Sequence, residues 1–225
     1  MLFKKAHQGR CFCAGFRYYR DMIAIIDYGM GNLRSVEKGF LKVGVDVRVT
    51  NRPEDVDNAD GVVLPGVGAF KDCMQELANL DLVDAVADVI RKGKPYLGIC
   101  LGLQVLFSES EEFGKCRGLD IFRGKVVRFE KSGLKIPQMG WNQLNIKNNN
   151  PLFNGIPDKS YFYFVHSFYV APEDNSIIAT TTDYGVEFTS SVRKDNIFAV
   201  QFHPEKSQAL GLRLLKNFGD IVAAK

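Results

Sequence analysis

Hydrophobic runs and helical patterns alternate along the first hundred residues of the chain. The pattern predicts strands at residues 22–27, 45–50, 61–64 and 95–99, and helices at 33–43, up to Leu77 and at 82–91. Residues 22–26 are apolar without a break, which is typical of a strand buried on both faces of a parallel sheet. Strands that alternate with helices predict a parallel sheet with helices on its faces, which is an α/β fold.

The pattern changes after about residue 118. Predicted strands then follow one another at 121–129, 141–146, 161–170, 177–182, 187–192 and 197–202, before a final helix at 207–222. The turns between these strands are rich in Asn, Gly and Pro, which favours antiparallel hairpins. We therefore predict one α/β domain with a mostly parallel central sheet and an antiparallel extension in its second half.

Composition narrows the class of protein. Of the 225 residues 46% are hydrophobic and 24% are charged, which excludes a disordered or fibrous chain. No stretch approaches the ~18 consecutive apolar residues of a membrane span, and the first residues lack the apolar core of a secretory signal. The five cysteines are an odd number, which points to reduced thiols. We expect a soluble, cytoplasmic protein with no membrane partner.

The net charge of +3 comes from one end of the chain. Residues 1–21 carry five basic side chains and one acidic, a balance of +4, whereas the rest carries 24 basic and 25 acidic, a balance of −1. The body is therefore not basic, and no nucleic-acid partner is expected. We interpret 1–21 as a basic extension, either a disordered tail or an upstream start, and 22–225 as the functional domain. His7, Cys11 and Cys13 are too sparse to predict a metal site.

Cys100 stands at the end of a predicted buried strand, with Gly98 and Gly102 two residues away on either side. This is the form of a nucleophile elbow, in which glycines avoid collisions between a tight turn and its neighbours. Backbone N–H groups at the start of the helix expected to follow would favour the thiolate. The alternative is a buried structural cysteine, and Cys73 and Cys116, which lack flanking glycines, fit that reading.

A cysteine nucleophile needs a base, and His203 is the better candidate. It follows a predicted strand, and Glu205 two residues later projects to the same side of extended backbone, with Pro204 preventing a helix there. Glu205 could then orient the imidazole, as the third member of a triad does. His166 lies in an aromatic strand without an adjacent carboxylate, and we interpret it as a packed or interface histidine.

These motifs together resemble the class I (triad) glutamine amidotransferases. The matching segments, in chain order, are Asp27 to Asn32, Leu64 to Gly68, Gly98 to Gln104, Gln138 to Asn142, Tyr163 to Ser167 and Gln201 to Ser207. The resemblance covers everything except residues 1–21. It implies a flavodoxin-like amidotransferase fold, and it is closest to glutaminase subunits that serve histidine biosynthesis.

The resemblance implies a glutaminase reaction. Cys100 would attack the side-chain amide of glutamine, His203 would move the proton and Glu205 would orient His203. The backbone N–H groups of Leu101 and Val67 would bind the oxyanion, the latter after rotation of its peptide, although Pro-Gly-x-Gly can also be a simple strand-ending turn.

The resemblance also implies contacts with the substrate and no metal or cofactor. Gly68, Gln104, Glu112, Ser167 and Phe168 match substrate-binding positions of the family. From the residues alone, Gln104 could be a helix surface residue and Glu112 part of a solvated acidic run at a helix end. Ser167 and Phe168 depart from the Thr-Tyr pair that is common in the family.

A partner is implied because ammonia must reach its acceptor unprotonated, and the chain shows no second reaction site. The family pairs the glutaminase with a (β/α)₈-barrel cyclase as a heterodimer. Asn32, Met139, Trp141, Tyr163 and His166 are the expected interface anchors, although Trp141 could be core instead.

Three alternatives stay open from the residues. One is a paralogous subunit that feeds another acceptor, such as a surface sugar. Another is a cysteine hydrolase of similar fold, such as a small peptidase. The third is a catalytically silent binding module, which the complete set of Cys100, His203 and Glu205 argues against.

Overall fold

Five parallel strands form the centre of the main sheet in the computed structural model, which describes residues 22–130, 133–147 and 149–224. In sheet order they are β2 (Val47–Thr50), β1 (Ile23–Ile26), β3 (Gly61–Gly66), β4 (Tyr96–Cys100) and β14 (Ile197–Val200). Every neighbouring pair among them is parallel. The predicted α/β fold with a parallel core is confirmed. The extension at residues 1–21 lies outside the described residues.

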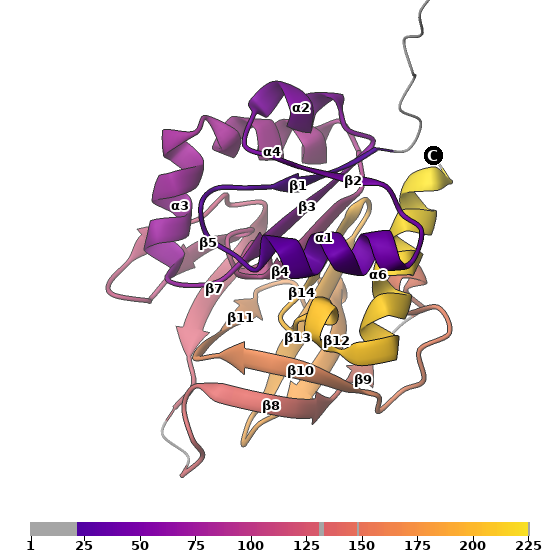
Figure 1. Cartoon of the computed structure of the whole chain (residues 1–225). Helices are drawn as coiled ribbons and strands as arrows, with labels where there is room; N and C mark the ends of the chain where they lie inside the picture. The colour runs from indigo at the N-terminus through magenta and orange to yellow at the C-terminus, as the bar shows by residue number, and fades with distance from the viewer. Residues whose placement is uncertain (1–21, 131–132, 148, 225) are drawn as a thin grey trace, which may run out of the picture.

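Helices cover both faces of these strands (Figure 1). One face carries α1 (Leu33–Lys42) and α6 (Gln208–Ala223), and the other carries α2 (Pro53–Asn58), α3 (Phe70–Asn79) and α4 (Leu82–Arg91). Successive residues of a strand point to opposite faces, so Ile23 and Ile25 of β1 pack with α1 and α6, whereas Ala24 and Ile26 pack with the other three helices. The unbroken apolar run is thereby explained, because both faces of the strand are buried.

Antiparallel strands extend the same sheet beyond β14. They continue in the order β13 (Glu187–Lys194), β11 (Phe168–Pro172), β7 (Phe122–Arg128), β5 (Phe107–Ser110) and β6 (Cys116–Arg117). Off this path, β12 (Ile178–Asp183) pairs with β13, and β9 (Asn145–Ile146) pairs with β12. Only β5 and β7 pair in parallel among these described strands. A separate antiparallel pair consists of β8 (Gln138–Gln143) and β10 (Tyr161–His166). Short 3₁₀ turns are η1 (Pro151–Phe153), η2 (Asn175–Ile177) and η3 (Pro204–Lys206). The predicted antiparallel extension is confirmed.

Several local predictions need correction. The helix after Cys100 is a single turn, α5 (Leu101–Gln104), and the acidic run that follows belongs to strand β5 rather than to a helix end. Phe107 causes the change, because its fully buried ring packs on Phe122 and draws the segment alongside β7. Asn32 directly precedes α1, where its residue type favours a helix N-cap, but its side chain makes no capping hydrogen bond. Helix α2 was not predicted, since its six residues bury only Val56.

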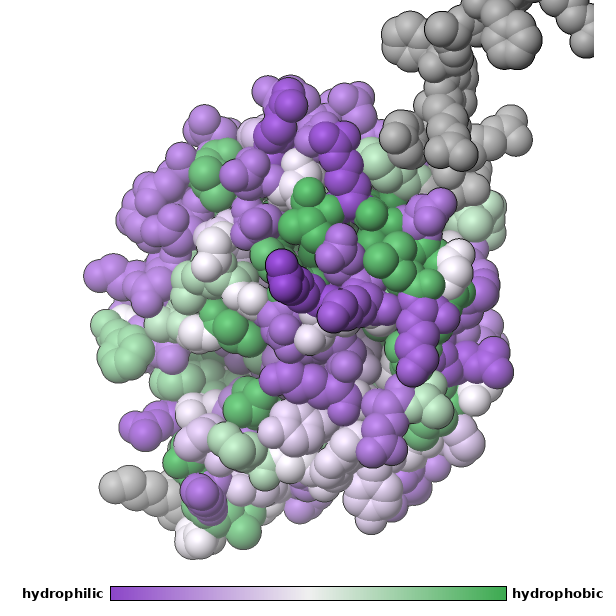
Figure 2. Space-filling view, viewed as in Figure 1, coloured by the Kyte–Doolittle hydropathy of each residue, from purple (hydrophilic) through white to green (hydrophobic). Residues whose placement is uncertain are grey.

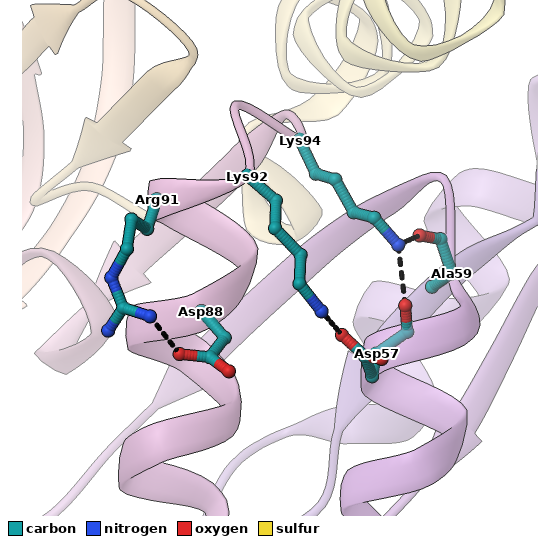
Figure 3. A network of polar contacts seen from close by, with 6 residues as sticks. All are labelled: Asp57, Ala59, Asp88, Arg91, Lys92 and Lys94. Carbon is teal, nitrogen blue, oxygen red and sulfur yellow. Dashed lines mark hydrogen bonds and ion pairs between the residues drawn. The ribbon is translucent and has the colours of Figure 1, made fainter.

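A polar network connects the amino ends of β3 and β4 (Figure 3) and extends to the start of β14. Lys94 Nζ donates to the carbonyl oxygens of Asp57 at 2.5 Å and Ala59 at 2.7 Å, and Lys92 pairs with the Asp57 carboxylate. These carbonyls lie at the C-terminal end of α2, where a cation is favourable. Asn196 Nδ2, directly before β14, donates to the Lys94 carbonyl at 2.6 Å. Three strand starts are thus bound to one another at the edge opposite their carboxyl ends.

On the face shown in Figure 2, hydrophobic residues form patches that are broken up by hydrophilic ones. None of the helices in the described part of the chain combines the length and the apolar character needed to cross a bilayer.

Candidate active site

The carboxyl ends of β3, β4 and β14 meet beside a pocket of about 340 Å³. Ligands of open α/β sheets bind at this edge of parallel strands. The residues predicted to bind substrate or oxyanion all line the pocket, namely Val67, Gly68, Leu101, Gln104, Glu112, Ser167 and Phe168, together with Cys100 and His166. Segments separated by a hundred residues in the sequence are therefore brought to one place.

Cys100 has the backbone of a nucleophile elbow. Its φ of 56° and ψ of −104° lie in a region that non-glycine residues rarely adopt, which places the thiol at the corner between β4 and α5. The flanking glycines leave room for the turn: a Cβ on Gly98 would lie 2.3 Å from the Gly102 carbonyl oxygen, and one on Gly102 would lie 1.8 Å from the Leu64 carbonyl oxygen. The steric reason expected for both glycines is confirmed.

Replacing Gly102 by alanine should destabilise the fold strongly. The new methyl group would meet rigid backbone of β3, so strand and turn would have to separate, at a cost of roughly 3–5 kcal/mol. Urea unfolding followed by circular dichroism measures this. The matched control is Gly39→Ala in α1, where the added methyl meets only the movable Leu215 Cδ1 at 2.6 Å. Equal losses in the two variants would contradict the argument from backbone collision.

His203 and Glu205 form a buried pair. The ring nitrogen Nδ1 lies 2.8 Å from Glu205 Oε1, and the side chains are 2% and 1% exposed. Burial lowers the pKa of His203, but the charges of Cys100 and Glu205 and the hydrogen bond with Glu205 outweigh it and raise the pKa to about 10. Nε2 is buried and makes none of the hydrogen bonds found among the described residues, which leaves it available to Cys100. At neutral pH the ring is therefore an imidazolium.

His166 lies in the pocket wall, and this corrects its assignment to the partner interface. The ring is nearly inaccessible because Phe129, Phe164 and Phe188 enclose it. Its Nδ1 lies 2.8 Å from the carbonyl oxygen of Phe168. A carbonyl oxygen only accepts, so Nδ1 carries the hydrogen and Nε2 has the lone pair. Burial lowers the pKa of His166 to about 4, although the hydrogen bond with the Phe168 carbonyl raises it by a smaller amount.

The pKa values of the two histidines are therefore shifted in opposite directions, and their protonation states should differ near neutral pH. We expect ¹⁵N-histidine NMR to show His166 neutral, with its hydrogen on Nδ1, from pH 8 down to about pH 5, and His203 charged up to about pH 9. A His166 ring that protonates near its ordinary value of 6.5 would contradict the tautomer derived above.

The same pKa shifts determine how the free energy of unfolding changes with pH. For His166 the unfolded chain binds a proton more readily, so its contribution to the free energy of unfolding is lost as pH falls from 6.5 towards 4, by about 3 kcal/mol. For His203 the folded state binds the proton more tightly, so stability present below pH 6.5 is lost as pH rises through 10.

Gln104 is not a surface residue, because it is 4% exposed. Its Nε2 donates to the Phe168 carbonyl at 3.0 Å and to Gln201 Oε1 at 3.1 Å. Gln201 in turn places Nε2 3.5 Å from Cys100 Sγ. The sequence interpretation gave Gln201 no role, and its only signal was its position two residues before His203.

The Phe168 carbonyl is fully occupied, which changes the contact expected there. It accepts from Gln104 and from His166, and a carbonyl oxygen has two lone pairs. A substrate contact at Phe168 therefore has to use atoms other than this oxygen.

Glu112 lines the pocket with a carboxylate that is held in position. Its Oε2 accepts a hydrogen bond of 2.7 Å from the N–H of Phe70 at the start of α3.

Three of the five predicted interface residues share one surface on the paired strands β8 and β10. Met139 is 59% exposed and Trp141 is 42% exposed, so Trp141 is not core. The centres of the Trp141 and Tyr163 rings lie 6.0 Å apart in an edge-on arrangement. Lys206 Nζ lies 5.8 Å from the centre of the Tyr163 ring. Asn32 is half-buried before α1. Within the described ranges, no three side chains among His, Cys, Asp and Glu are grouped so that they could hold a metal ion.

Comparison with known proteins gives a consistent result. The family model described as glutamine amidotransferase class-I matches residues 24–221. The chain is 57% identical over 206 residues to imidazole glycerol phosphate synthase subunit HisH of Syntrophotalea carbinolica, covering 89% of this chain and 100% of that one. The subunit of the same name from Geobacter sulfurreducens is 55% identical over 205 residues, covering 88% and 98%. A crystal structure of a glutamine amidotransferase superposes with a TM-score of 0.70 at 16% identity, over 90% of this chain and 99% of that chain, and supports the fold.

Proposed function

This chain belongs to the class I glutamine amidotransferases, and from that membership we propose that Cys100, His203 and Glu205 hydrolyse L-glutamine to supply ammonia to a separate cyclase subunit. The function is that of the glutaminase subunit of imidazole glycerol phosphate synthase in histidine biosynthesis. The observation that carries the residue assignment is the electrostatic coupling of the buried His203–Glu205 pair to Cys100, which lines the pocket.

The first half of the reaction forms a thioester. The Cys100 thiolate attacks the side-chain amide carbon of glutamine and gives a tetrahedral oxyanion. His203 Nε2 then donates its proton to the amide nitrogen, the carbon–nitrogen bond breaks and ammonia leaves. Because the pKa of His203 is raised to about 10, the ring already holds this proton at neutral pH. Glu205 keeps Nδ1–H engaged and thereby aims Nε2 at the reacting atoms.

The second half regenerates the enzyme. Water attacks the thioester carbon while neutral His203 Nε2 takes a proton from it. Collapse of the tetrahedral species breaks the carbon–sulfur bond, and glutamate leaves with the Cys100 thiolate restored. One glutamine and one water are consumed, and one glutamate and one ammonia are produced.

Backbone donors stabilise the oxyanion in this scheme. Leu101 is the first residue of α5, so its N–H has no partner in the helix ladder. Val67 follows β3 at the pocket, where a turn of its peptide would bring a second N–H inward. Gly68, with φ of +99°, provides the freedom for that rotation. Losing one such donor costs ~10²–10³ in rate in known enzymes.

Substrate recognition uses the rest of the pocket. Glu112 offers a carboxylate for the α-amino group of glutamine. Gln104 uses both hydrogens of its amide within the protein, so its Oε1 is the atom left for the substrate. Gly68 and Ser167 contribute backbone to the same wall, and Phe168 contributes through atoms other than its carbonyl oxygen.

The partner is a (β/α)₈-barrel cyclase that docks on the surface formed by Met139, Trp141 and Tyr163, and Asn32 before α1 is a further expected contact. Exposed aromatic side chains of this kind are typical anchors of an interface. The acceptor in the barrel is phosphoribulosyl-formimino-aminoimidazole carboxamide ribonucleotide, which is cleaved to imidazole glycerol phosphate and aminoimidazole carboxamide ribotide. The names of the curated relatives do not favour an alternative acceptor such as a surface sugar.

Glutamate release tests the proposal. It is measured for the chain alone, with the barrel subunit, and with the barrel subunit plus its nucleotide substrate. We expect a weak rate for the isolated chain and a strong rise in the loaded complex, because the Val67 peptide must turn. A full rate without the partner would refute the need for that turn, and no glutaminase activity in any combination would refute the function.

A further inference from the structure

Gln201 is a completely buried polar residue beside the nucleophile. It follows β14, and its backbone N–H donates to the Ser190 carbonyl of β13 at 2.9 Å, so the residue is fixed to the sheet. Its side-chain Nε2 lies 3.5 Å from Cys100 Sγ, and the reaction scheme above gives it no task. A buried amide in contact with a reacting atom calls for a specific role.

The orientation of this amide follows from one backbone carbonyl. The Phe168 oxygen can only accept, so the Gln104 atom facing it at 3.0 Å must be the nitrogen. That nitrogen uses its second hydrogen on Gln201 at 3.1 Å, so the Gln201 atom on that side must be the oxygen. The Gln201 nitrogen is then the end that faces Cys100 Sγ. The assignment of oxygen and nitrogen in both amides therefore rests on hydrogen-bond logic.

We propose that Gln201 is a positioning residue that directs a fixed N–H donor at Cys100 Sγ and stabilises the thiolate, with Gln104 holding its amide in place. A hydrogen bond to an ionised acceptor is stronger than one to a neutral group, so the donor favours the thiolate over the thiol. The inference rests on the proposed function, because it deepens the role of the same cysteine. It also gives Gln104 a task besides substrate contact.

Other titratable groups surround Cys100, and the test must keep them constant. His203 with Glu205 behind it, Tyr28 and Cys73 act on it electrostatically, and Glu112 and His166 share its pocket. Gln201→Met alters none of them. Methionine has a similar length and no N–H, so the variant removes the donor with little change in volume.

Alkylation of Cys100 by iodoacetamide reports the thiolate directly. The rate is followed between pH 5 and pH 10 in the full chain by mass spectrometry of the peptide that contains Cys100, which separates it from the other cysteines. We expect Gln201→Met to react about tenfold more slowly than wild type on the rising part of the rate–pH curve, from the loss of one charge-assisted hydrogen bond. At high pH, where the thiol is ionised in both proteins, the variant should react as fast as wild type or faster. The control is Gln75→Met on the exposed surface of α3, which should follow the wild-type curve.

Each outcome decides the proposal. A rate–pH curve displaced to higher pH with a common plateau supports it. An unchanged curve overturns it, and so does a rate that is lower by the same factor at every pH, since that pattern means damaged packing. If Gln201→Met does not fold, the same curve is measured on Gln104→Met, which releases the Gln201 amide and should show a smaller displacement in the same direction.

This measurement is independent of glutamine turnover. A wild-type protein that fails to hydrolyse glutamine with its partner would refute the proposed function but leave the alkylation result valid. An unchanged alkylation curve beside normal glutamine hydrolysis would refute the role of Gln201 alone.

Discussion

Replacing Cys100 by alanine should abolish glutamine-dependent synthesis by the assembled pair, with a loss of at least about 10³-fold, while ammonia-dependent synthesis stays near wild type. The variant lacks the only atom proposed to form the thioester, and no other described side chain in the pocket offers a thiol. Added ammonia bypasses this step, because it enters the acceptor reaction as the product that Cys100 would have released. Product formation is measured with glutamine and with an ammonium salt as the nitrogen source.

The matched control is Cys116→Ala. This half-buried cysteine lies in β6, away from the pocket, and its thiol contacts only the neighbouring Arg117 carbonyl among the hydrogen bonds found. Both activities should be retained. If Cys100→Ala instead loses both activities together, the cysteine has a structural role at the strained corner between β4 and α5, and the nucleophile must be sought elsewhere.

Replacing Glu205 by glutamine should lower kcat for glutamine hydrolysis by roughly 10³–10⁴ with little change in KM. The corresponding change in the serine-protease triad has an effect of ~10⁴, because an amide can hold the imidazole in the wrong tautomer. Here the carboxylate is 1% exposed and its Oε1 is 2.8 Å from Nδ1, so no water can take its place. Loss of its charge also removes one of the interactions that raise the pKa of His203.

Glu187→Gln is the control for this change. Glu187 is exposed and pairs with Lys147 at 3.1 Å, and a surface ion pair contributes little to stability. Its kcat should remain within about twofold of wild type. A Glu205→Gln variant that keeps more than a tenth of wild-type kcat would mean that backbone contacts alone orient His203, for example the hydrogen bond from Ser207 Oγ to its carbonyl at 2.6 Å.

The elements predicted best are those whose signal is local. The helix at 82–91 was placed at its observed bounds, because its hydrophobic residues recur at helical spacing and its buried face is continuous. The elbow was also readable, since Gly98 and Gly102 stand within two residues of Cys100, although the collision that requires Gly102 is with Leu64 of β3.

The elements missed depend on contacts between distant segments. Strand β5 lacks alternation, and it becomes a strand by pairing with β7 and β6. Two of the rings that enclose His166 come from distant segments, Phe129 directly after β7 and Phe188 in β13, and no spacing along the chain reveals them. The contacts of Gln201 were also not predictable from local sequence, because its partners lie about a hundred residues earlier in the chain.

The network around Lys94 has a consequence for how this protein tolerates change. It fastens the strand starts at one edge of the sheet, whereas the strained Cys100 turn and the pocket loops occupy the opposite edge. Cooperative resistance to unfolding is thereby concentrated where no chemistry takes place. Loops at the chemical edge can be remodelled by a bound partner, or altered over evolution, without loosening the scaffold that holds the strands in register.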